Sequence, residues 1–143
     1  MRRLKTFVQL PVNEQTLLLR TALTVGTIRL ALWVLPFSFV RRESIRRGTL
    51  QTGGAPQASY GIERIVWAVR AVSRCIPGAT CLTQAMAAQH LLGRCGHRST
   101  VQIGVANDDR RGFEAHAWLV HGEQILLGGA TADRFVALTA WEA

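Results

Sequence analysis

Residues 79–93 read ATCLTQAMAAQHLLG, and this stretch decides how the rest of the chain is interpreted. Apolar side chains recur at helical spacing, which predicts a central helix over residues 81–92. Thr80 stands just before it and belongs to a residue type that caps helix N-termini. Cys81 is therefore expected in the first turn, where unpaired N–H groups and the helix dipole favour a thiolate. The thiolate is the nucleophilic form of cysteine.

The pattern changes from helical spacing to a two-residue alternation after this helix. It predicts three strands, over residues 99–106, 114–120 and 124–129. His116 lies in the second strand and is expected to share a face with Glu114 and Trp118, because side chains alternate along a strand. A histidine on a strand, opposite a helix that begins with cysteine, is the arrangement of a cysteine–histidine hydrolase.

The order of the elements is helices first and then an antiparallel meander, which predicts an α+β domain. Residues 61–75 form a further expected helix, with apolar side chains on one face and arginines on the other. Residues 49–59 are polar and contain Gly-Gly and proline, so they predict a linker. We therefore expect a basic helical arm over residues 1–48, the linker over 49–59, and a core over 60–143.

The arm contains the most apolar part of the chain, residues 16–40. Arg20 and Arg29 interrupt its apolar run, so one or two packed helices are expected rather than a membrane span. Pro36 ends this pattern, and a basic amphipathic segment follows up to Gly48. Packing on the core or against a partner is the expected use of the arm, and an interfacial helix on a membrane surface is the alternative.

The composition fits one domain and limits the partners. A chain of 143 residues with 48% hydrophobic and 18% charged residues has the size and balance of a single globular domain. Seventeen basic residues against nine acidic ones give a net charge of +8, which suits an acidic or membrane-surface partner, although a coding bias toward arginine gives the same excess. The arginines are not interleaved with aromatic residues, so no nucleic-acid partner is expected.

The cysteines predict neither a disulfide framework nor a metal site. They stand at 75, 81 and 95, an odd number without a recognisable secretory signal, which favours a reducing cytoplasm. Their spacing lacks the close pairs of a zinc site, so no metal or other cofactor is expected. From the residues alone, a buried core cysteine and a structural histidine remain the alternative to catalysis.

Several motifs together resemble one known family. Cys81 opens a helix that ends LLGRCG, a strand ending IGV follows, and the string AHAWL over residues 115–119 precedes a short LLGG strand. A helical arm rich in arginine and leucine, ending LPF, precedes them. This ordered set is similar to the transglutaminase-like cysteine peptidase of lasso-peptide biosynthesis, in its stand-alone form, over nearly the whole chain.

The resemblance implies a papain- or transglutaminase-like core, in which the helix of the nucleophile packs on a small antiparallel sheet. It implies removal of the leader peptide from a lasso-peptide precursor, a ribosomally made macrolactam peptide. The implied partners are a leader-binding carrier protein and an asparagine-synthetase-like cyclase. Carried over by motif, Cys81 is the nucleophile and His116 is the general base and acid.

The third catalytic position departs from the family pattern. The family has an aspartate about a dozen residues after the histidine, whereas this chain has Leu127, Gly128 and Gly129 there. Asp133 is one candidate for the orienting role, and a backbone or amide group is another. The departure also supports an alternative function, a non-catalytic transglutaminase-like module that bridges the maturation partners.

Overall fold

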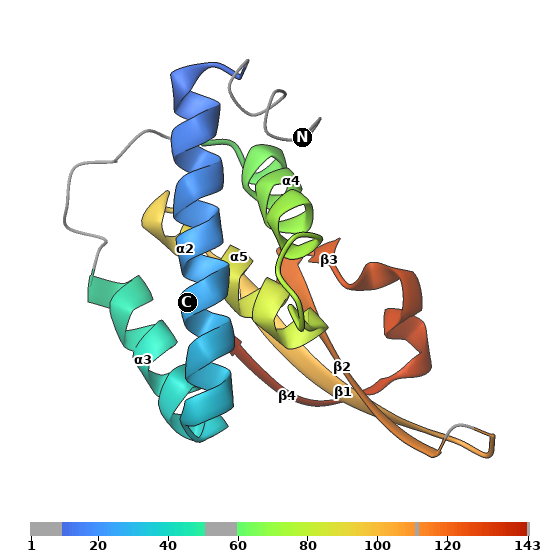
Figure 1. Ribbon diagram of the computed structural model, residues 1–143. Helices are drawn as coiled ribbons and strands as arrows, with labels where there is room; N and C mark the ends of the chain where they lie inside the picture. The colour runs from blue at the N-terminus through green and yellow to red at the C-terminus, as the bar shows by residue number, and fades with distance from the viewer. Residues whose placement is uncertain (1–9, 51–59, 111, 143) are drawn as a thin grey trace.

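The structure is a computed structural model that describes residues 10–50, 60–110 and 112–142. Within these ranges, four helices gather on one side of a four-stranded antiparallel sheet (Figure 1). The helices are α2 (Val12–Val34), α3 (Phe37–Leu50), α4 (Ile62–Ser73) and α5 (Cys81–Arg94). The strands are β1 (Thr100–Asp108), β2 (Gly112–His121), β3 (Gln124–Leu127) and β4 (Val136–Glu142), with a 3₁₀ helix, η1 (Gly129–Arg134), before the last.

The central helix is α5, as the sequence predicts. It packs against α2, α3 and α4 and against β1 and β2. Three alanines on it, at positions 85, 87 and 88, are fully buried, and such small side chains let several neighbours approach the helix closely. The predicted cap is confirmed, because the Thr83 N–H donates to Thr80 Oγ1 at 3.4 Å. The helix ends at Arg94, two residues later than predicted, and Gly96 follows with φ +81°.

The sheet has the strand order β3-β2-β1-β4 and confirms the predicted α+β meander over its first three strands. The fourth strand, β4, was not among the predicted elements. It pairs with β1 at the edge of the sheet, and of its seven residues only Trp141 is buried. An edge strand with little buried surface lacks the clear alternation from which strands are recognised.

One buried polar group joins α5 to β4 and to Ser99, the residue just before β1. The Gln89 side chain, 1% exposed, donates from Nε2 to the carbonyls of Ser99 and Trp141, each at 3.1 Å. Its Oε1 accepts a hydrogen bond from Trp141 Nε1 at 3.0 Å. Since an unpaired polar group in the core is costly, this fully bonded amide fixes the position of the helix over the sheet.

The N-terminal arm shares this core. One face of α2 is buried against α4 and α5, and its buried residues are Leu17, Thr21, Val25 and Ile28. Glu14 forms an ion pair with Arg64 of α4, which holds the two helices together. The basic helix α3 continues to Leu50, two residues past the predicted end at Gly48. The remainder of the predicted linker, residues 51–59, lies outside the described residues.

Candidate active site

Cys81 is the first residue of α5, and its half-buried side chain packs against the core. Local hydrogen bonds fix the entry into the helix. The Gln84 N–H donates to the Thr80 carbonyl at 3.0 Å, and the Gln84 side-chain amide donates to the Ala79 carbonyl at 3.1 Å. The thiol therefore stands on an ordered helix N-terminus, where backbone N–H groups without helical partners favour negative charge.

His116 lies half-buried on β2, directly opposite Gly104 of β1. Its ring lies between two aromatic rings, with centroids 6.1 Å from Trp118 and 5.1 Å from Phe135. The predicted sharing of a face with Trp118 is therefore confirmed. Ring Nε2 lies 2.8 Å from the carbonyl oxygen of Gly128. Because a carbonyl only accepts, Nε2 carries a hydrogen, and in the neutral ring Nδ1 keeps a free lone pair that can accept a proton.

The position of that carbonyl depends on a backbone conformation at Gly128 that other residues rarely adopt. Its φ of +79° lies in the left-handed region, and an added Cβ would stand 2.7 Å from the carbonyl oxygen of Ala117. A side chain here would both strain the backbone and collide with β2. The carbonyl lies twelve residues after His116, at the point where the resemblance leads one to expect an aspartate. The structure thus supplies a backbone group, one of the two expected candidates, beside the ring.

Asp133 lies on η1 with an exposed side chain. Among the described residues, no hydrogen bond joins it to His116. Its neighbour Arg134 faces Glu114 at 3.8 Å, which ties η1 to β2. Within the described residues, the structure therefore gives His116 a hydrogen bond to Gly128 and none to Asp133.

Cys81 and His116 come from elements that pack together, α5 and β2. Ala117 and Leu119 belong to the core that α5 covers, so the alternation of β2 turns His116 toward the side of the sheet where η1 lies (Figure 1). In the part of the chain that the structure describes, no hydrogen bond joins the thiol to the imidazole.

The other cysteines and two of the histidines have different surroundings. None of the three cysteines forms a disulfide; Cys75 is exposed and Cys95 is half-buried. His97 and His121 form their own ring pair, with centroids 6.4 Å apart. Across residues 10–50, 60–110 and 112–142, no group of three or more histidine, cysteine, aspartate or glutamate residues could hold a metal ion.

A comparison with protein families agrees with this arrangement. The model described as "Transglutaminase-like superfamily" matches residues 22–140, from within α2 to within β4. The chain belongs to the transglutaminase-like superfamily. Searches of curated proteins and of solved structures returned no match. The family confirms the expected fold, and domains of this superfamily are often cysteine peptidases.

The residue types of Cys81 and His116 identified them as candidates in the sequence. Two other residues near the His116 ring could not be identified in this way. Gly128 acts through its backbone, and its only trace in the sequence is the Gly-Gly pair at the expected distance. Phe135 reaches the ring because the chain crosses from β3 to β4 through η1, and the fourth strand was not predicted.

Proposed function

We propose that this transglutaminase-like protein is a cysteine peptidase that removes the leader peptide from a lasso-peptide precursor in the cytoplasm. It acts with a leader-binding carrier protein and an asparagine-synthetase-like cyclase. The observation that carries the proposal is the 2.8 Å hydrogen bond between His116 Nε2 and the Gly128 carbonyl, which leaves Nδ1 available for proton transfer. The capped helix N-terminus at Cys81 and the ordered motifs that surround it add support.

The reaction is an acyl transfer in two steps. The Cys81 thiolate attacks the carbonyl carbon of the last leader residue, and His116 donates a proton to the departing amine of the core peptide. His116 then takes a proton from water, which attacks the thioester and releases the leader. The reaction requires the thiol and the imidazole to come together, whereas among the described residues no hydrogen bond joins them and His116 is turned to the face of β2 away from the core under α5.

The helix N-terminus also supplies a site for the oxyanion. The Cys81 backbone N–H belongs to the first turn of α5, where N–H groups have no partner within the helix. Such a group can donate to the oxygen of the tetrahedral intermediate. The nucleophile and one stabilising donor are therefore provided by the same residue.

The second candidate function is a non-catalytic module that bridges carrier and cyclase. The missing hydrogen bond between Cys81 and His116, together with the exposed position of Asp133, favours this alternative. The two proposals differ in whether the Cys81 sulfur is required.

The test incubates the full-length protein with precursor and carrier and follows the peptides by mass spectrometry. Wild-type protein and Cys95→Ser should release leader and core peptide, whereas Cys81→Ala should release neither, because no other thiol stands at a helix N-terminus. Cys95→Ser is a matched control, since Cys95 is also half-buried. Cleavage by Cys81→Ala would contradict the peptidase, and carrier and cyclase binding without cleavage by the wild type would favour the bridging module.

A further inference from the structure

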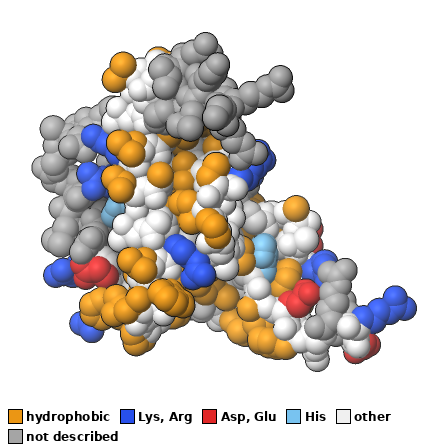
Figure 2. Space-filling view, viewed as in Figure 1, with side chains coloured by type: hydrophobic (Ala, Val, Ile, Leu, Met, Phe, Trp, Pro, Cys, Tyr) orange, Lys and Arg blue, Asp and Glu red, His pale blue; other side chains and the backbone are white. Residues whose placement is uncertain are grey.

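Large apolar side chains lie exposed at the corner where α2 passes into α3. Their exposed fractions run from 36% for Phe37 to 77% for Trp33. Figure 2 shows a continuous hydrophobic area at the lower left, over this end of the two helices. We call the set the apolar corner: Leu30, Trp33, Val34, Leu35, Phe37 and Phe39.

The backbone of the corner is fixed by contacts with the core. Phe37 meets the buried ring of Trp141 edge-on, with centroids 5.8 Å apart. Arg41 lies over the same indole, 5.0 Å from its centroid, and Val40 is 5% exposed. These anchors hold α3 against the core, while the side chains of Phe39 on α3 and Trp33 at the end of α2 stay exposed. The corner is therefore an ordered apolar projection.

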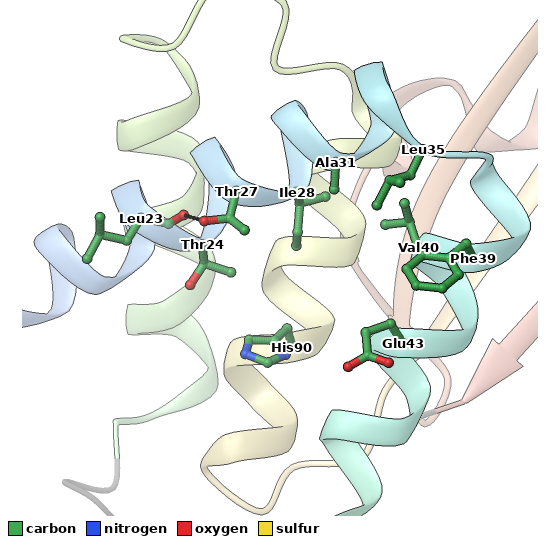
Figure 3. A pocket seen from close by; sticks show the side chains of 10 residues that line it. All are labelled: Leu23, Thr24, Thr27, Ile28, Ala31, Leu35, Phe39, Val40, Glu43 and His90. Carbon is green, nitrogen blue, oxygen red and sulfur yellow. Dashed lines mark hydrogen bonds between the residues drawn. The ribbon is translucent and has the colours of Figure 1, made fainter.

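The apolar surface continues from the corner into a groove between α2 and α3. This groove has a volume of about 350 Å³, and Leu35 and Phe39 lie at one end of it (Figure 3). Its ionisable lining side chains are Glu43 of α3 and His90 of α5. A contiguous exposed apolar surface of this kind marks an interaction site rather than ordinary protein surface.

The charge beside the corner is positive. The sequence of α3, FSFVRRESIRRGTL, contains four arginines and one glutamate. Arg42 is exposed, whereas Arg46 forms an ion pair with Glu43 at 3.2 Å. Aromatic side chains next to arginines on an amphipathic helix are the combination that binds the boundary of an anionic bilayer, where rings enter the headgroup region and guanidinium groups meet phosphates.

We propose that the apolar corner inserts into the headgroup region of anionic membranes and attaches the protein peripherally. A span by α2 is a different arrangement: by length and composition the helix could cross a bilayer, and 22% of its most apolar window is buried. The buried face of α2, with Val25 and Ile28, packs on α4 and α5, and Glu14 pairs with Arg64. Spanning would break these contacts, whereas insertion of the corner leaves them intact.

The test is co-sedimentation of the full-length protein with vesicles of phosphatidylcholine, with and without phosphatidylglycerol. Wild-type protein should sediment with the vesicles that contain phosphatidylglycerol and stay in solution with phosphatidylcholine alone. High salt should release it. The double variant Trp33→Ser/Phe39→Ser should lower the bound fraction at least tenfold. Phe113→Ser, which removes an aromatic side chain of similar exposure (73%) from the β1–β2 hairpin, should bind like the wild type.

A second measurement uses vesicles with brominated acyl chains, which quench tryptophan fluorescence only on close approach. Wild-type fluorescence should be quenched, and the conservative variant Trp33→Phe should lose this quenching while it still binds. The proposal is overturned by failure to bind phosphatidylglycerol vesicles, by equal loss in Phe113→Ser, or by membrane attachment that resists salt and alkaline washing. Loss of carrier binding in the double variant, without vesicle binding by the wild type, would assign the corner to a protein partner.

Discussion

Tryptophan occupies opposite environments at the two ends of this molecule. Near the candidate active site, Trp118 is 5% exposed, stacks on His116, and donates from Nε1 to Gln102 Oε1 at 2.7 Å. At the apolar corner, Trp33 is 77% exposed. The protein itself therefore covers the Trp118 ring, whereas most of the Trp33 side chain remains exposed. Substitutions should therefore affect chemistry or stability at the first end and association at the second.

The largest effect is expected for His116→Ala. Loss of a general base lowers rates by about a hundredfold or more, so leader removal should slow by at least that factor while the domain stays folded. The measurement is a time course of cleavage by mass spectrometry, with circular dichroism as a check on folding. His121→Ala is the matched control on the same strand and should change the rate little. Similar losses in both variants would indicate structural damage and weaken the contrast between the two ends.

A smaller effect, on stability, is expected for Gln89→Leu. The amide bonds the carbonyls of Ser99 and Trp141 and the Trp141 indole, so its removal takes one hydrogen bond from each of two buried carbonyls and one buried N–H. Unpaired buried groups cost about 1–3 kcal/mol each, and the added apolar contact offsets part of this, so we expect a loss of about 2–4 kcal/mol. Urea unfolding measures it. Gln84→Leu, which removes one local bond on the half-exposed face of α5, should cost at most about 1 kcal/mol.

The smallest effect is expected for Trp33→Ser, which tests whether the exposed tryptophan contributes to stability. A side chain that is 77% exposed contributes little to the folded state, so the free energy of unfolding should change by at most about 0.5 kcal/mol. Cleavage in vesicle-free solution should also stay near the wild-type rate. A destabilisation of about 2 kcal/mol or more would mean that Trp33 packs on the protein, and the two tryptophans would then no longer differ.

The sequence predicted the elements whose periodicity is strong. The apolar stripe and cap of α5 and the alternation of β1 and β2 gave helix and strands close to their true bounds. Edge strand β4 escaped prediction because only Trp141 on it is buried. The exposure of Trp33 could not be predicted either, since α2 is apolar around much of its circumference and periodicity alone does not say which side meets the core.

In the candidate site, the sequence identified the two reactive side chains but not the hydrogen-bond partner of the histidine. Cys81 and His116 are visible because thiol and imidazole are rare, reactive side chains placed at specific points of a helix and a strand. The hydrogen-bond partner of His116 is a main-chain oxygen, which every residue possesses, so no side-chain pattern identifies it. Only the folded path of the chain through Gly128, with its positive φ, shows which carbonyl reaches the ring.

A carbonyl as the hydrogen-bond partner of His116 affects how well a positive charge on the imidazole ring is stabilised. It fixes the tautomer as a carboxylate does, but it carries no net charge, so it gives less electrostatic stabilisation to an imidazolium. A backbone carbonyl also has no proton to gain or lose, so its capacity to accept the hydrogen bond from the ring does not change with pH. Orientation of the ring is in this way independent of pH and depends on backbone geometry at a single glycine.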